Sequence, residues 1–194
     1  MDFNLSPQHE VFRRTVAEFV DKEVTPRVPE METRGEWPTD LFRRMGELGY
    51  FGLRYPEQYG GANADSVMFA IFLEELARGY MSLAAAAMMQ CLMGTNFIFR
   101  YGTQDQRERL LVPAIRGDKV GTIAMTEPGA GSDLGAITTR AVWDGECYVI
   151  DGTKSWITSA TRADFFTVAA KTNLDPKAGF RGIDMFLVEK GTPG

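Results

Sequence analysis

The first part of the chain carries apolar residues at helical spacing. Ser6 and Pro7 are typical of a helix start, and apolar positions then recur from Val11 to Val20 along one helix face. The same pattern predicts helices over residues 7–30, 37–49, 65–79, 82–102 and 103–117. Short connections favour antiparallel neighbours, so we expect a bundle of about five helices, the first of them interrupted near Pro26.

The pattern changes after Asp118. Short segments rich in β-branched and aromatic residues are separated by turn signals, which predicts strands over residues 119–126, 137–144, 147–152, 154–158, 164–171 and 183–190. Because no helices intervene, an antiparallel sheet, sandwich or barrel is favoured over a doubly wound fold. We predict an α+β chain with an all-α helical bundle in domain 1–117 and an antiparallel β domain in 118–194. The final turn predicts that the β domain is incomplete.

Composition narrows the function classes. The 194 residues are 44% hydrophobic and 24% charged, as in ordinary globular proteins. A net charge of −5 without any Lys/Arg-rich run argues against nucleic-acid binding. His9 is the single histidine, and Cys91 and Cys147 lie far apart, so neither a metal site nor a Ser/His triad is expected. No apolar run approaches a membrane span and the first residues are acidic and polar, so we expect a cytoplasmic protein without a membrane span.

One glycine-rich stretch, "AMTEPGAGSDLGA" (124–136), lies between two apolar segments. Gly129 and Gly131 begin a G-x-G-x-x-G pattern, but the third glycine is missing and no βαβ unit follows. A Gly-Lys-Ser/Thr phosphate loop is absent as well. Glycines still let backbone N–H groups approach an anion, and Thr126 and Ser132 add hydroxyl groups. This chemistry suits a pyrophosphate or a flavin edge, with a purely structural turn as the alternative.

The same stretch carries two carboxylates, Glu127 and Asp133. They could form an acid–base pair. The structural interpretation is favoured, because Asp in such turns usually accepts hydrogen bonds from backbone N–H groups, and Glu127 beside Pro128 is expected to pair with a nearby arginine.

A second stretch, "DGTKSWITSA" (151–160), contains an aromatic and a hydroxyl residue at strand spacing. If residues 155–158 form a strand, Trp156 and Thr158 lie on one face. They could then wall a planar ligand and donate one hydrogen bond to its edge. A core tryptophan with a routine neighbouring threonine is the alternative.

Taken together, in this order and after a helical half, "AMTEPGAGSDLGA" and "GTKSWIT" resemble the acyl-CoA dehydrogenase family of flavoproteins. The segments "SLAAAAMMQCLMG" and "YGTQDQRERLLVPAIRGDKVGTIAMTEP" resemble that family too. The resemblance implies an N-terminal α domain, a middle β domain and a C-terminal helical domain, with FAD held between the last two. The C-terminal helical domain is missing from these residues.

The resemblance also implies specific roles. The residues expected to bind the cofactor lie in two stretches: Ile123, Met125, Thr126, Gly131, Ser132, Trp156, Ile157 and Thr158. Thr126 would line the flavin ring, Ser132 would also contact the acyl-CoA substrate, Trp156 would shield one flavin edge, and Thr158 would bond near flavin N5.

The implied reaction is FAD-dependent α,β-dehydrogenation of an acyl-CoA thioester to the 2-enoyl-CoA, as in fatty acid β-oxidation. A carboxylate removes the α-proton while hydride passes to flavin N5. An electron-transfer flavoprotein would accept the electrons, and family members are commonly homo-tetramers. The catalytic glutamate is expected beyond residue 194, whereas Glu74 and Glu75 are expected to form ion pairs.

Two other functions remain compatible with the sequence. An acyl-CoA oxidase or a related flavin monooxygenase would share the motifs and differ in its reaction with dioxygen. A truncated family member could instead act as a non-catalytic binding or assembly module, which would hold no flavin.

Overall fold

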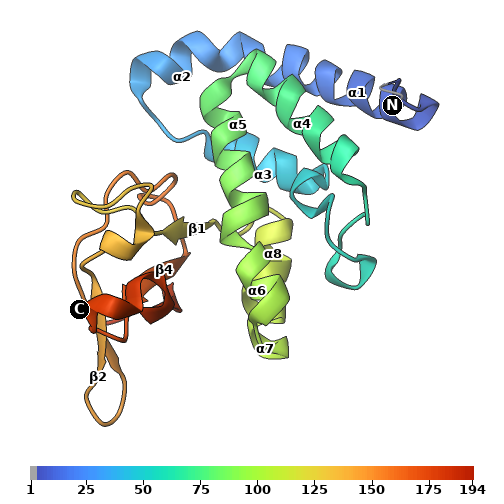
Figure 1. Cartoon of the computed structure of the whole chain (residues 1–194). Coiled ribbons are helices and arrows are strands. Elements are labelled where there is room, and N and C mark those ends of the chain that lie inside the picture. The colour runs from blue at the N-terminus through green and yellow to red at the C-terminus, as the bar shows by residue number, and fades with distance from the viewer. Residues whose placement is uncertain (1–3) are drawn as a thin grey trace. The chain divides into compact units, whose positions relative to one another are not determined.

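The computed structural model describes residues 4–194, which divide into two compact units between Val120 and Gly121. The sequence pattern predicts this boundary three residues earlier, between Gly117 and Asp118. The first unit is helical and the second is built around one sheet (Figure 1). The predicted α+β class, helical bundle first and β domain second, is confirmed.

The helical unit contains eight α-helices in the described chain. They are α1 (Pro7–Phe19), α2 (Val28–Arg34), α3 (Thr39–Glu47), α4 (Ser66–Gly79), α5 (Met81–Met88), α6 (Asn96–Tyr101), α7 (Gln104–Gln106) and α8 (Val112–Ile115). Single turns of π-helix extend three of them: Val20–Val24, Met89–Gly94 and Arg107–Leu111. The predicted long helices therefore exist as near-continuous segments with local changes of winding.

Local chemistry explains where α1 begins and what it packs against. The Ser6 hydroxyl accepts a hydrogen bond from the His9 backbone N–H, and Pro7 occupies the first helical turn. The apolar face of α1 packs on α4, where Phe72 is fully buried. Phe72 lies 4.9 Å from the Tyr50 ring, so aromatic contacts form the centre of this core.

The helix α3 approaches the end of α8 very closely at Gly46. A Cβ atom added there would lie 2.2 Å from the carbonyl oxygen of Arg116. Only glycine permits this approach, because the obstructing atoms belong to the backbone.

The segment Met81–Tyr101 corrects one expectation. By length and composition alone, these 21 residues are apolar enough to cross a membrane, whereas the sequence pattern predicts no such run. In the structure, 50% of the apolar window is buried within the helical unit. This is the behaviour of a core helix, and it is weak evidence for a membrane span.

The second unit holds one five-stranded sheet among the described residues. Its strands are β1 (Gly121–Ala124), β2 (Arg140–Trp143), β3 (Tyr148–Asp151), β4 (Phe165–Lys171) and β5 (Ile183–Glu189). The strand β4 is central: β5 pairs antiparallel along its whole length, and β1 pairs parallel with its first half. The β2–β3 hairpin joins β4 at its far end, through Arg140 and Lys171.

The prediction of an antiparallel sheet was therefore only partly right. Pairings β2–β3 and β4–β5 are antiparallel, but β1–β4 and β2–β4 are parallel. Parallel pairing requires a long connection, and the whole segment between Ala124 and Phe165 supplies one without a crossover helix.

The predicted strand over 154–158 was wrong. These residues form an irregular loop, in which Trp156 (φ 59°) and Ser159 (φ 66°) have left-handed backbone conformations. Side-chain alternation along an extended strand consequently does not apply to Trp156 and Thr158.

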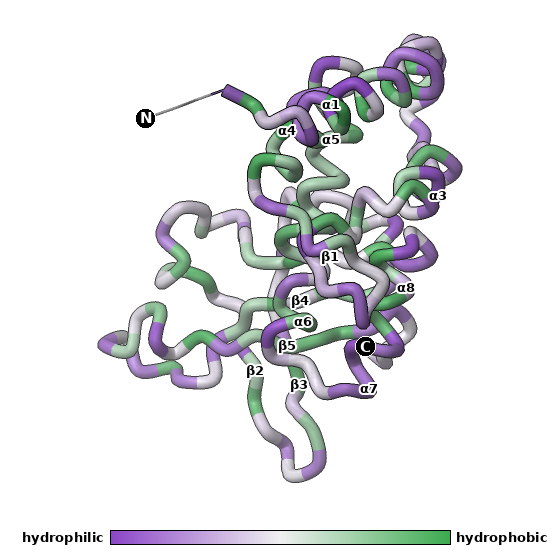
Figure 2. Tube along the Cα trace, turned by 90° about the vertical axis from the view of Figure 1, so that its right-hand side faces the viewer, coloured by the Kyte–Doolittle hydropathy of each residue, from purple (hydrophilic) through white to green (hydrophobic). Residues whose placement is uncertain are grey.

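The β2–β3 hairpin exposes apolar side chains. Figure 2 shows hydrophobic stretches along both of its strands. Trp143 packs edge-on against Tyr148 at 5.3 Å, and Tyr148 against Phe186 of β5 at 5.1 Å. Aromatic contacts thus connect the hairpin to the rest of its sheet.

Candidate functional site

The glycine-rich stretch reverses the chain just after β1. Glu127 and Ala130 exchange backbone hydrogen bonds of 2.9 and 3.1 Å, with Pro128 and Gly129 between them. Ala130 is buried in a small apolar cluster with Ile137. Gly131, Ser132 and Asp133, which follow the reversal, are exposed.

The Glu127 carboxylate is the most heavily bonded group of this region. It accepts hydrogen bonds from the Thr138 backbone N–H (2.6 Å), the Thr138 hydroxyl (2.8 Å), the Thr139 backbone N–H (3.0 Å) and Lys154 Nζ (2.8 Å). Burial alone would raise the pKa of Glu127, but these donors outweigh it and hold that pKa far below its usual range. A carboxylate held ionised in this way is a poor general acid or base.

Asp133 also has a structural contact. Its carboxylate accepts a hydrogen bond of 3.0 Å from the Gly135 backbone N–H and caps a short 3-10 turn, Leu134–Ala136. Both carboxylates of the stretch thus agree with the structural interpretation, except that the cationic partner of Glu127 is a lysine and not an arginine.

The second stretch lies directly against the first. Lys154 Nζ donates a further hydrogen bond, of 2.9 Å, to the Met125 carbonyl. The Ser155 backbone N–H donates to the Thr126 carbonyl at 3.0 Å. The Thr158 carbonyl in turn accepts a 2.7 Å hydrogen bond from the hydroxyl of Thr122 in β1. The structure therefore brings the 125–126 and 154–158 segments together at the end of one strand.

Unpaired polar groups gather in this second segment. The hydroxyls of Ser155 and Ser159 are buried without a hydrogen-bond partner in the described chain. Among the residues that the structure describes, the backbone N–H groups of Trp156, Ile157 and Thr158 make no backbone–backbone hydrogen bond. Buried polar groups in proteins are almost always paired, so the two unpaired hydroxyls favour a ligand-contacting surface here.

Trp156 supports the same interpretation. Its side chain is 93% exposed, which is unusual for the largest apolar side chain, and its backbone is held in a left-handed conformation. Non-glycine residues in that conformation are strained, and such strain concentrates at functional sites. Trp156 is not a core residue of this unit.

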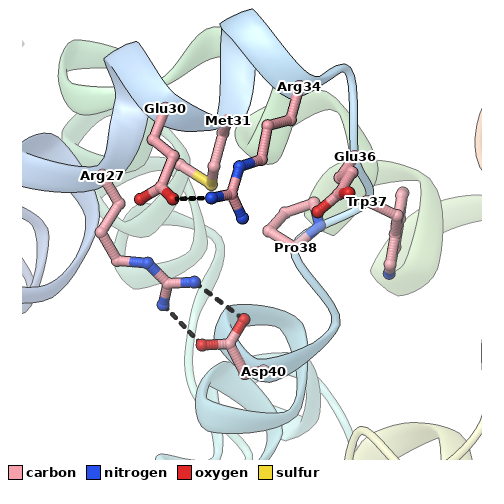
Figure 3. Close-up of a pocket in the computed structure, with 8 residues that line it drawn as sticks. All are labelled: Arg27, Glu30, Met31, Arg34, Glu36, Trp37, Pro38 and Asp40. Carbon is pink, nitrogen blue, oxygen red and sulfur yellow. Dashed lines mark hydrogen bonds and ion pairs between the residues drawn. The ribbon is translucent and has the colours of Figure 1, made fainter.

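One pocket of the helical unit is lined by two ion pairs. Figure 3 shows one of about 140 Å³, in which Arg27 contacts Asp40 through two hydrogen bonds of 2.6 and 2.9 Å. Arg34 pairs with Glu30 at 2.8 Å in the same pocket. With no charge left uncompensated among these four groups, we interpret this pocket as structural.

Glu74 and Glu75 are engaged as well. Glu74 accepts a hydrogen bond of 2.8 Å from Arg13, and the largely buried Glu75 accepts one of 2.9 Å from Arg78. The Arg13–Glu74 pair links α1 to α4, whereas the Arg78–Glu75 pair lies within α4. Both agree with the ion pairing expected from the sequence.

Comparison with known families identifies the chain. The model described as the N-terminal domain of acyl-CoA dehydrogenase matches residues 6–118, and the model for the middle domain of the same enzymes matches residues 122–194. The chain belongs to the acyl-CoA dehydrogenase family. Its resemblance to that family, stated above from the two motifs, is confirmed over nearly its whole length.

Individual relatives agree with the assignment of this chain to the acyl-CoA dehydrogenase family. It is 47% identical to the benzylmalonyl-CoA dehydrogenase of Aromatoleum aromaticum, covering 100% of this chain and 50% of the relative. A crystal structure of acyl-CoA dehydrogenase from Geobacillus kaustophilus superposes with a TM-score of 0.93 at 38% identity, over 100% of this chain and 51% of that one. A structure of an FAD complex of PigA superposes at 0.91 with 28% identity, over 100% and 51%. The chain thus spans about half the length of the relatives it matches.

The predicted cofactor-binding residues are unequally placed in the structure. Ile123 is buried in β1, and Met125, Thr126, Ile157 and Thr158 are half-buried. Gly131, Ser132 and Trp156 are exposed. Hydrogen bonds join the two segments at Met125 and Thr126, whereas Gly131 and Ser132 lie beyond the chain reversal.

Sequence reasoning missed four residues of this region: Thr138, Thr139, Lys154 and Ser159. A signal for Lys154 was present, because it is a lysine within the second motif and Glu127 is a carboxylate within the first. Opposite charges in two motifs expected to share one ligand site predict a contact between them. No comparable signal marks the threonines, which contribute through backbone N–H groups as well as a hydroxyl.

Ser159 leads to a stability prediction. Replacing it by glycine is expected to raise the free energy of unfolding by about 1 kcal/mol, because glycine accepts a φ of 66° without strain and the unpaired buried hydroxyl is removed. Denaturant unfolding measures the change. Ser159→Ala separates the two causes, since it removes the hydroxyl but keeps the strained conformation. Equal stabilities of the two variants would contradict the contribution of strain.

Proposed function

We propose that the protein catalyses FAD-dependent α,β-dehydrogenation of an acyl-CoA thioester, with the 2-enoyl-CoA as product. The observation that supports this most directly is the junction of the two family motifs. Ser155 bonds Thr126 across it, and the exposed Trp156 follows Ser155, whose buried hydroxyl has no partner among the described residues. A planar cofactor with a polar edge would match an exposed indole next to an unpaired hydroxyl.

The residues present fit FAD as the cofactor. Thr126, Trp156, Ile157 and Thr158 would contact its ring system, and Gly131 and Ser132 would lie toward its phosphates, with Ser132 also reaching the acyl-CoA. When bound, FAD supplies the acceptor for the hydride and so carries the redox chemistry. The contribution of the chain is to orient that group and to donate hydrogen bonds to its edge.

The proposed reaction also needs a base that removes the α-proton. Glu127 is held ionised by four donors, and Glu74 and Glu75 are committed to arginines. We propose that none of these three carboxylates is the base. Within the described residues, their task is structural.

The proposed function also includes a substrate class and partners. Straight-chain fatty acyl-CoA, as in lipid β-oxidation, is one substrate class. The similarity to a benzylmalonyl-CoA dehydrogenase, at 47% identity, favours acyl groups with an aromatic substituent as another. We further propose an electron-transfer flavoprotein as the electron acceptor, a homo-tetramer as the assembly and the cytoplasm as the location.

Visible absorbance of the intact, purified protein tests the proposal. We expect flavin bands, present on purification or gained on adding FAD, and their bleaching when an acyl-CoA substrate is added without oxygen. Rapid consumption of dioxygen during turnover would favour an acyl-CoA oxidase or a flavin monooxygenase. No flavin absorbance even after added FAD would support a non-catalytic binding or assembly module.

Thr158 provides a more specific prediction. Replacing it by valine is expected to slow flavin reduction by about tenfold, the equivalent of one hydrogen bond of ~1.4 kcal/mol, while FAD affinity changes less. Stopped-flow reduction and FAD titration measure the two effects. Thr161→Val, an exposed position in the same loop, is the matched control. Equal losses of rate and affinity, or no loss of either, would count against the role assigned to Thr158.

A further inference from the structure

Three segments of the second unit meet at one carboxylate. Glu127 belongs to the chain reversal after β1, Thr138 and Thr139 lead into β2, and Lys154 opens the loop that follows β3. The Glu127 side chain is 3% exposed and that of Lys154 is 11% exposed. All three segments are therefore fixed by a contact that is nearly closed to solvent.

This ion pair, with Nζ and Oε1 2.8 Å apart, differs from an exposed ion pair between β2 and β3. Arg140 Nη2 and Asp151 Oδ2 lie 2.9 Å apart, but their side chains are 55% and 68% exposed. Exposed pairs contribute little to either stability or geometry. In a buried pair, the attraction between the charges roughly offsets the free-energy cost of their desolvation. The clearest effect of such a pair is therefore to select one arrangement of the groups around it.

Lys154 also connects the pair to the candidate ligand surface. Its ammonium group bonds the Met125 carbonyl, and the next residue, Ser155, bonds the Thr126 carbonyl. These two contacts form a double link between the end of β1 and the start of the loop. The residues just beyond the link are Trp156, Ile157 and Thr158, whose N–H groups make no backbone–backbone hydrogen bond within the described chain.

We propose that Glu127 and Lys154 are positioning residues for the cofactor. They act through the 125–126 and 155–158 segments and do not touch the flavin themselves. The proposal rests on the proposed function, in which those two segments contact FAD. Removing the link should misplace both segments, and displacements of about 1 Å lower rates by about 100-fold.

Lys154→Met is the central variant, because methionine keeps the length of the side chain and loses its charge. Flavin reduction by acyl-CoA is expected to slow by about 100-fold. In the flavin-free protein, the amides of Ser155 and Ala163, which are hydrogen-bonded in the loop, should exchange with solvent at least about tenfold faster. Lys154→Arg should recover most of both losses. Arg140→Met is the matched control and should change neither quantity.

A second variant separates positioning from folding. Lys154→Met leaves an uncompensated buried carboxylate and lowers stability, whereas Glu127→Gln combined with Lys154→Met leaves no charge and should restore much of it. We expect this double variant to melt near the parent protein and still to reduce flavin slowly. Normal flavin reduction and normal amide exchange in a folded double variant would overturn the proposal.

The two proposals fail in different ways. A parent protein that binds no FAD would overturn the proposed function, and with it the positioning of a flavin. The role of the ion pair alone would be overturned by a different result. In that result the parent protein binds and reduces FAD normally, and the Lys154→Met variant has the same FAD affinity, reduction rate and amide exchange.

Discussion

Replacement of Glu127 by alanine is expected to lower the free energy of unfolding by about 3–5 kcal/mol, because it leaves the buried ammonium group of Lys154 without its counter-charge. The Thr138 and Thr139 N–H groups lose their acceptor at the same time. Chemical denaturation followed by a probe in the second unit, such as the fluorescence of Trp143, measures the loss.

The control uses the exposed ion pair of the same sheet. Asp151→Ala removes the partner of Arg140, but solvent replaces that contact, and the expected loss is below about 1 kcal/mol. Similar losses for Glu127→Ala and Asp151→Ala would show that burial does not determine the strength of the first pair.

The same carboxylate predicts a pH dependence. The pKa of Glu127 is lowered in the folded state relative to its ordinary value of 4.5. Its contribution to stability is therefore complete above pH 4.5 and is lost as the pH falls from there toward the folded-state pKa. Thermal melts of the parent protein should shift downward over that acid range, and those of Glu127→Gln should shift less. Parallel shifts in both proteins would assign the acid sensitivity to other groups.

Gly46→Ala is expected to lower the free energy of unfolding by about 2–3 kcal/mol. The new Cβ would lie 2.2 Å from the Arg116 carbonyl oxygen, so α3 and the end of α8 must move apart. The better helix propensity of alanine offsets only about 1 kcal/mol of that cost. Denaturant titration of the intact protein measures the change.

Gly35 is the matched control for this substitution. It has a φ of 60° and no atom within 4 Å of an added Cβ. Alanine there would have a strained backbone conformation, but its Cβ would clash with no other atom. The expected loss is about 1 kcal/mol. A Gly35→Ala loss as large as that of Gly46→Ala would mean that the close approach to Arg116 carries no special cost.

Helices and the order of the two units could be predicted from the sequence because both depend on local patterns. The spacing of apolar residues after Pro7 describes one helix face, of which Val16, Phe19 and Val20 are buried in the structure while Val11 is exposed. The two motifs were informative for a different reason, since their residue types resemble a known family. Their contact with each other, through Ser155 and Thr126, was implied only by that resemblance.

The rest depends on partners that are distant in the chain. The parallel pairing of Ile123 with Thr167 follows from the path of the intervening residues and cannot be recognised in the sequence of either strand. The loop at Trp156 has the composition of a strand, but tertiary contacts of Lys154 and Ser155 override that preference. The identity of the Glu127 partner required the same three-dimensional information.

The pairing of β1 with β4 also has a consequence during synthesis on the ribosome. Gly121–Ala124 leaves the ribosome well before Phe165–Val168, so the edge of β1 stays unpaired until β4 has been made. The second motif is made in that interval, and its loop bonds to Thr122 of β1, a strand that is fixed in the sheet only when β4 pairs with it. Maturation of the ligand surface is therefore expected to be one of the last events in the folding of this unit, and the interval before it the period in which the nascent chain is most prone to aggregate.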